Sequence, residues 1–169
     1  MKLHKPDGYK DLLVYKRAAE LRLYVQKLTE KLSYDEKRRI VHLNDSARSV
    51  KQNVVEGWKR STTQQYYEFL SFSIGSLAEI KEDIKDLFDD QKIKKVTHDF
   101  FTEKCNELDY LLNRLRQSLY AKMQREGTLP MKEKYQNLKN TRQSEDEFLN
   151  KLTKEAGLKR LENGQYVPE

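Results

Sequence analysis

Residues 46–84 read SARSVKQNVVEGWKRSTTQQYYEFLSFSIGSLAEIKEDI, and this stretch decides the fold of the 169-residue chain. Apolar and small residues recur in it at steps of three and four, which places them on one face of a helix. The polar residues 59–63 interrupt the pattern. The stretch therefore predicts two long amphipathic helices joined by a short loop.

The same periodicity continues on both sides of this stretch. It predicts helices over about residues 9–32, 33–60, 63–89 and 97–126. Capping patterns mark the boundaries, with Ser33 and Glu36 as one capping box and Ser61 and Gln64 as another. The predicted N-caps are Asp7, Ser33, Ser61 and Thr97, and Gly127 is the expected residue after the last helix. Four long helices with short connections favour an all-α protein, in which residues 8–127 form an antiparallel up-down-up-down four-helix bundle.

The apolar stripes of these helices predict the core. Their residues are Val14, Ala18, Leu21, Val25, Leu28 and Leu32; Ile40, Leu43, Ala47, Val50, Val54 and Gly57; Tyr66, Leu70, Ser73, Leu77, Ile80, Ile84 and Leu87; and Phe101, Cys105, Leu108, Leu112, Leu115 and Leu119. A second apolar surface, which a self-assembling bundle needs, is predicted from Tyr15, Phe69, Phe72, Phe88, Tyr110 and Leu111.

Residues 128–169 are predicted to form a polar C-terminal extension that is partly disordered. Ser144 and Glu147 form a capping box for one short amphipathic helix, which Gly157 ends. This segment is too polar to bury the apolar area that independent folding needs. We expect it to pack along the bundle, to bind a partner, or to stay mobile.

Composition restricts the class of protein. The chain has one cysteine, which excludes an intramolecular disulfide framework and fits a reducing compartment. Neither a secretory signal nor a run of roughly 20 apolar residues is present. We therefore expect a soluble, cytoplasmic protein with no membrane partner.

The net charge of +6 is distributed unevenly. Residues 1–60 hold 15 Lys and Arg against 8 Asp and Glu, whereas residues 61–100 hold 5 against 8. The basic excess therefore belongs to the first two helices. A basic surface attracts phosphate backbones, although many basic proteins never bind nucleic acid.

Catalytic and metal-binding patterns are missing from the sequence. A di-iron bundle needs Glu-x-x-His pairs, but Met1, Arg39 and Lys95 occupy the Glu position before the three His residues. Cys105 lies on an apolar stripe, which favours a buried structural thiol over a nucleophile. We expect no enzymatic activity, no metal and no cofactor.

Basic residues of the first two helices are the candidate nucleic-acid contacts. Arg48, Lys51 and Lys59 are spaced to share one helical face, where they would form a salt-sensitive phosphate-binding stripe. An ordinary solvated face is the alternative. The predicted set is Arg17, Arg38, Arg39, Arg48, Lys51, Lys59 and Arg60, and Lys16, Arg22 and Lys37 are further basic candidates. Tyr66 and Tyr67 could stack on bases, but the periodicity favours a core position for Tyr66 and a rim position for Tyr67.

Polar residues also occur among the stripe residues. We expect Asn53, Glu56 and Ser76 to form a structural polar network between helices, because an unpaired buried polar group costs about 1–3 kcal/mol. Arg60 is a further candidate member, and a ligand site is the alternative reading. Small residues around Gly75 should let another helix approach closely, either within the bundle or between subunits.

Several of these segments, taken in order, carry a resemblance to a known family. They are YKDLLVYKRA at residues 9–18, NVVEG at 53–57, RS at 60–61, FL at 69–70 and GSLAE at 75–79. The chain resembles the four-helix-bundle proteins encoded in intervening sequences of bacterial 23S rRNA genes. Related to that family are the accessory variability determinants of diversity-generating retroelements.

The resemblance implies a homo-oligomer, typically a pentameric barrel with a central channel, and no known catalysis. It also implies a basic surface that binds nucleic acid and, in the retroelement relatives, a reverse transcriptase. The chain departs from the family pattern at Tyr15, where a Trp is usual, and at Asn44 and Asp45, where two Arg are expected.

Two functional hypotheses follow. The first is a non-enzymatic oligomeric protein that binds RNA or DNA, or serves a ribonucleoprotein or reverse transcriptase, through its basic face. The second is a protein-interaction scaffold that uses the bundle surface and the C-terminal extension without nucleic acid.

Overall fold

The computed structural model describes residues 7–129, 148, 151, 158–160 and 166–168. The chain divides into two compact units, residues 1–128 and 129–169. The first unit holds two short 3₁₀ helices and four long α-helices. These are η1 (Gly8–Asp11), α1 (Leu13–Thr29), η2 (Tyr34–Glu36), α2 (Lys37–Trp58), α3 (Thr63–Asp89) and α4 (Lys95–Glu126).

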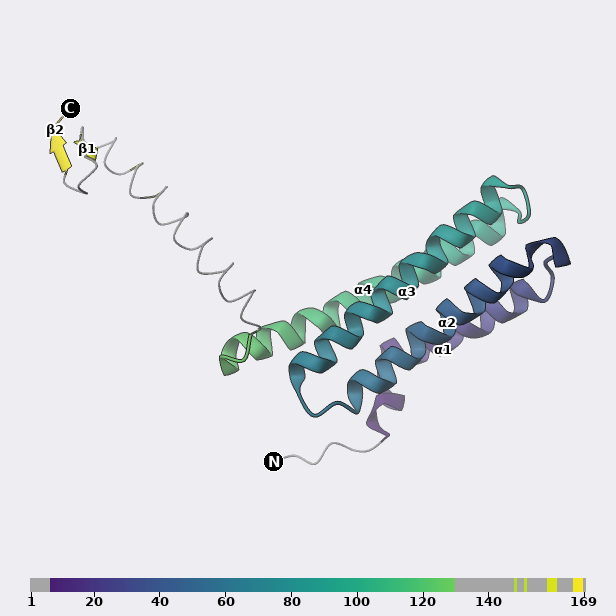
Figure 1. The fold of residues 1–169 in the computed structure, drawn as a ribbon, viewed down its shortest axis with the longest axis horizontal. Coiled ribbons are helices and arrows are strands. Elements are labelled where there is room, and N and C mark those ends of the chain that lie inside the picture. The colour runs from purple at the N-terminus through teal and green to yellow at the C-terminus, as the bar shows by residue number, and fades with distance from the viewer. Residues whose placement is uncertain (1–6, 130–147, 149–150, 152–157, 161–165, 169) are drawn as a thin grey trace. The chain divides into compact units, whose positions relative to one another are not determined.

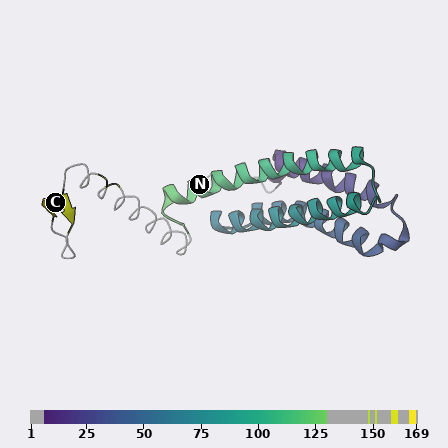
Figure 2. The ribbon, with the colours of Figure 1, turned by 90° about the horizontal axis from the view of Figure 1, so that it is seen from above.

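The four helices form an antiparallel bundle in which each loop reverses the chain (Figure 1). Hydrogen bonds show that α2 and α3 are antiparallel. Val50 of α2 is bonded to Ser73 of α3, whereas Ser46, earlier in α2, is bonded to Glu79, later in α3. Seen from above, α1 and α4 form one layer and α2 and α3 the other (Figure 2). Each helix therefore contacts its two neighbours around the bundle.

The predicted stripes supply almost the whole core. Eighteen buried side chains form one cluster, and all of them belong to the stripes. Leu28, Leu32, Leu115 and Leu119 are only partly buried, and they pack against this cluster. Met123 is buried as well, although it lies outside the predicted stripe.

Two predicted N-caps, Asp7 and Thr97, are wrong, and a third, Ser33, lacks the predicted side-chain hydrogen bond. The chain is extended at Leu12, so residues 8–11 form a separate 3₁₀ turn and Asp7 makes no side-chain cap. Ser33 precedes η2 and likewise makes no side-chain cap. Helix α4 begins at Lys95, before Thr97. Ser33 does have the extended backbone of a cap, as predicted, whereas Leu12 and Lys94 have it in place of Asp7 and Thr97. The path of the loop sets which residue this is, and the local pattern does not encode that path.

The predicted range of α3, residues 63–89, is correct, but its cap residue differs from the prediction. Thr62 is the N-cap rather than Ser61, and its hydroxyl accepts a hydrogen bond from the Gln65 backbone N–H at 3.2 Å. The predicted end of the last helix is correct, since Gly127 follows α4 with the left-handed φ of 67° that glycine adopts most readily.

The two helical glycines of the bundle have opposite surroundings. A Cβ at Gly57 would lie 2.6 Å from Cδ2 of Tyr66 and 2.9 Å from Cβ of Phe69. Helices α2 and α3 therefore approach each other closely here because Gly57 has no side chain. At Gly75 no atom of the described residues lies within 4 Å of a Cβ, so the close helix approach expected at Gly75 does not occur within the bundle.

In the second unit, β1 (Leu158–Arg160) pairs antiparallel with β2 (Tyr166–Pro168), with Lys159 opposite Val167. The sequence analysis did not predict this pair. Phe148 and Lys151 are helical and exposed, and the rest of the helix predicted near residues 144–156 lies outside the described residues.

Candidate nucleic-acid interface

The cations of α1 and α2 fall into two groups, those with a carboxylate partner and those without. Arg17 belongs to the first group, since its Nε lies 2.6 Å from Glu107 on α4 and its Nη1 lies 2.8 Å from Glu20. Hydrogen bonds to Glu20 and then Glu107 raise the pKa of the guanidinium. Arg17 thus links α1 to α4, and its charge is already compensated.

Two more of the predicted contacts are compensated. Arg39 lies 2.9 Å from Asp90, and its buried Nη1 lies 3.1 Å from Glu36 without hydrogen-bonding geometry. Arg60 lies 3.6 Å from Glu56, and its guanidinium stacks over the Phe69 ring at 4.5 Å. These arginines connect parts of the bundle, which leaves less of their charge for an external anion.

The remaining predicted cations have no ion-pair partner among the residues described. Arg38 and Arg48 are exposed, and Lys51 is half-buried. Lys59 is exposed, and its ammonium lies 5.9 Å from the centre of the Tyr9 ring. Four of the seven predicted contacts are therefore available to an anion.

Helix α1 supplies another such cation opposite Lys51. Asn44 on α2 donates to the Thr29 hydroxyl on α1 at 3.0 Å, which fixes the register of this antiparallel pair. Arg22 lies seven residues before Thr29 and Lys51 seven residues after Asn44, and seven residues are close to two helical turns. Arg22 and Lys51 therefore lie at the same height along the bundle, both beside the contact between α1 and α2.

Arg22 and Lys51 are both half-buried, and neither has a carboxylate partner in the described part of the chain. Arg48 lies one turn from Lys51 and is exposed. We call Arg22, Arg48 and Lys51 the α1–α2 cation cluster. Like charges held near one another repel, so an anion placed among them would be stabilised. The sequence predicts Arg22 only as a general basic residue, because its position depends on helix register.

The opposite edge of α2 is neutralised by acidic residues of α3. His42 Nδ1 lies 2.6 Å from Asp83, and the Ser46 hydroxyl donates to Glu79 at 2.7 Å. The hydrogen bond to Asp83 is the main reason that the pKa of His42 is raised. The acidic segment found in the sequence thus faces the α2–α3 seam, whereas the free cations face α1 and solvent.

The predicted polar network is only partly assembled. Asn53 donates to the Ser49 hydroxyl at 3.2 Å, and Ser76 on α3 donates to the same hydroxyl at 3.0 Å. Ser49 therefore joins Asn53 to Ser76, a role that the sequence analysis missed. Glu56 is exposed and pairs with Arg60 instead, because it lies on the outer side of α2.

The two tyrosines considered for base stacking are both engaged. Tyr66 is buried in the core, where desolvation raises the pKa of its hydroxyl to about 12. Tyr67 is half-buried between the Tyr120 ring, 6.2 Å away, and the Arg116 guanidinium, 5.5 Å from its centre. Burial therefore excludes Tyr66 as a stacking residue, and Tyr67 already packs against two other side chains.

The part of the chain that the structure describes also bears on the metal-site and thiol expectations from the sequence. No group of three or more His, Cys, Asp or Glu side chains there could hold a metal ion. Cys105 is buried in the core, and burial raises the pKa of its thiol to about 12, so it stays protonated. None of the described helices is long and apolar enough to cross a membrane.

A family model described as 23S rRNA-intervening sequence protein matches residues 10–114. The chain belongs to this family. The matched region covers α1, α2, α3 and most of α4, and it includes the α1–α2 cation cluster and all seven predicted contacts. No curated protein matches this member of the 23S rRNA-intervening sequence protein family.

Proposed function

We propose that the protein is a non-enzymatic RNA-binding protein that contacts phosphates through the basic face of α1 and α2. The observation that carries this proposal is the α1–α2 cation cluster, in which half-buried Arg22 and Lys51 share a seam without a carboxylate partner among the described residues. Uncompensated cations at a helix seam attract a phosphate backbone without reading sequence. The name of the family, which refers to 23S rRNA, agrees with an RNA-related role.

The partner chemistry follows from the arrangement of these charges. The cluster continues along α2 to the exposed Arg38 on one side and Lys59 on the other. A helix rises about 1.5 Å per residue, so these two cations span roughly 30 Å. Such a line of positive charge fits a polynucleotide better than a single small anion. DNA and a reverse transcriptase, which the family resemblance suggests, belong to the same proposal as further partners.

The test compares a triple variant, Arg22→Gln with Arg48→Gln and Lys51→Gln, with the unchanged protein in RNA titrations at several salt concentrations. Three lost phosphate contacts should weaken binding and lower the slope of log affinity against log salt by about 2 for single-stranded RNA. A matched control replaces Lys85, Lys95 and Lys122 by Gln, since each is exposed and has an acid four residues away. Equal losses in both variants would mean that only net charge matters.

Self-association is a further part of the proposal. Phe72 on α3 is 58% exposed and Tyr110 on α4 is 64% exposed, although both are large and apolar. These side chains agree with the second apolar surface expected from the sequence, and the resemblance suggests a pentamer. The mass of the protein in solution measures this directly.

A further inference from the structure

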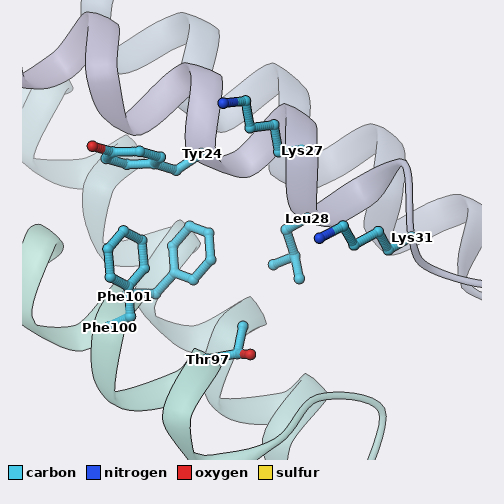
Figure 3. Close-up of a pocket in the computed structure, with 7 residues that line it drawn as sticks. All are labelled: Tyr24, Lys27, Leu28, Lys31, Thr97, Phe100 and Phe101. Atoms are coloured by element: carbon cyan, nitrogen blue, oxygen red, sulfur yellow. The ribbon is translucent and has the colours of Figure 1, made fainter.

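A pocket lies at the seam between α1 and α4, on the side of α1 opposite to α2 (Figure 3). Tyr24 and Leu28 line it from α1, and Phe100 and Phe101 line it from α4. The Phe100 ring meets Tyr24 edge to face with 5.0 Å between ring centres, and it meets Phe101 in the same way at 5.5 Å. The pocket walls are therefore mainly aromatic.

The pocket has the size of one ring system. Its volume of about 210 Å³ exceeds the roughly 150 Å³ of an engineered cavity that binds benzene. It lies below the roughly 300 Å³ at which pockets for drug-sized molecules begin. Phe101 is buried, whereas Phe100 is 37% exposed, so part of the Phe100 ring is open to a ligand.

Positive charge borders this aromatic surface. Lys27 lines the pocket from the last turn of α1 and Lys31 from the turn that follows it, and both are exposed (Figure 3). Neither forms an ion pair with any residue that the structure describes. Lys104 lies 5.8 Å from the centre of the Phe100 ring, but its charge is shared with Glu103 at 3.1 Å. The two free ammonium groups therefore favour a ligand that carries negative charge beside an apolar ring.

We infer that this pocket is a subsite for one unpaired base of single-stranded RNA. The base lies against the exposed part of Phe100, and the phosphates that flank it contact Lys27 and Lys31. Thr97 and Tyr24 also line the pocket, and each carries a hydroxyl that can donate or accept a hydrogen bond. This inference rests on the proposed function and adds a preference for unpaired RNA.

The preference follows from the shape of the pocket. A base in a duplex is stacked between its neighbours and paired, so it cannot enter a pocket without leaving the helix. The α1–α2 cation cluster, in contrast, can contact the phosphates of either form. The two sites lie on opposite sides of α1, so substitutions can test them separately.

The test uses the full-length protein and a single-stranded RNA of about 12 nucleotides, within the range of known single-strand site sizes. One base is replaced by the fluorescent base 2-aminopurine, and the same RNA annealed to its complement is the duplex probe. We compare Phe100→Leu with Tyr34→Leu, which removes another exposed ring that does not line the pocket. Thermal unfolding checks that both variants fold.

Phe100→Leu should weaken binding of the single strand by about 5- to 150-fold, the range for losing one stacked base. Quenching of the 2-aminopurine should disappear with it, while duplex affinity stays unchanged. Tyr34→Leu should leave all three readouts unchanged. A second variant, Lys27→Gln with Lys31→Gln, alters only exposed side chains and should lower the single-strand salt slope by about 1.4.

The outcomes separate the two proposals. If the unchanged protein binds both RNA forms equally and Phe100→Leu behaves like Tyr34→Leu, the subsite is wrong while the RNA-binding function stands. If the unchanged protein binds neither form, both proposals are overturned. If the double lysine variant keeps the full single-strand salt slope, the flanking phosphates do not lie where we place them, and the subsite as stated is wrong.

Discussion

Gly57 and Gly75 are both helical, but they have different reasons to be glycine. At Gly57 the nearest atoms to a Cβ belong to Tyr66 and Phe69, and Phe69 Cβ is fixed by the backbone of α3. At Gly75 the described residues leave open space, and the position is exposed. Gly57 thus permits a close approach of two helices, whereas Gly75 only lowers the stability of its own helix.

Gly57→Ala should therefore lower the free energy of unfolding by about 1–3 kcal/mol, the usual cost of overpacking. Gly75→Ala is its control and should raise that free energy by up to about 1 kcal/mol, because alanine favours the helix. Urea unfolding of the two variants measures both effects. A loss of stability at Gly75 as large as that at Gly57 would contradict this assignment and indicate that Gly75 contacts something beyond the described bundle.

At the scale of the residue, the sequence predicts well which side chains are buried. It predicts poorly which charged side chains form ion pairs. The stripes predict the buried residues because burial follows helical periodicity. Whether a cation is free depends on residues far away in the chain, since Arg17 meets Glu107 and Arg39 meets Asp90. For this reason the sequence grouped Arg17 and Arg39 with Arg48, although only Arg48 is free of an ion pair in the described structure.

At the scale of the helix, α2 carries different chemistry on its two edges. The edge toward α3 holds Ser46, Ser49 and His42, each of which is hydrogen-bonded to a side chain of α3. The edge toward α1 holds Asn44 and Lys51. The acidic residues of α3 compensate the first edge, so the second edge keeps its positive charge.

The contact between His42 and Asp83 predicts a pH dependence of stability. The hydrogen bond to Asp83 raises the pKa of His42 above its ordinary value of 6.5, so the folded state favours the protonated ring. The resulting stabilisation is complete below pH 6.5 and is lost as the pH rises through the higher folded pKa. Since His42 is half exposed, its size should stay below about 1 kcal/mol.

Urea unfolding between about pH 6 and pH 8 measures this effect. The unchanged protein should lose more stability over that interval than Asp83→Asn, in which His42 has lost its strongest partner. Identical pH profiles would show that the His42–Asp83 contact does not stabilise the pairing of α2 with α3.

At the scale of the whole bundle, an uneven charge along the sequence becomes an uneven charge around the molecule. The basic segment 1–60 supplies α1 and α2, and the more acidic segment 61–100 supplies α3 and the start of α4. Because consecutive helices are neighbours in an up-down bundle, each segment occupies one side (Figure 1). The number of helices and the basic side could therefore be predicted from the sequence.

Other features of the bundle could not be predicted. The α1–α2 cation cluster depends on the register of two helices, and the aromatic pocket depends on the seam between the first and last helices. Tyr24 and Phe100 lie 76 positions apart in the chain yet form one wall of that pocket. Neither relation leaves a local signal in the sequence.

Lysine footprinting of the protein with and without RNA tests the central claim most directly. An amine-reactive reagent labels exposed lysines, and mass spectrometry measures how far bound RNA protects each one. The account predicts protection of Lys51 and Lys59 on the basic face, with Lys85 and Lys122 on α3 and α4 labelled as before. Protection of Lys85 and Lys122 with full labelling of Lys51 and Lys59 would contradict it.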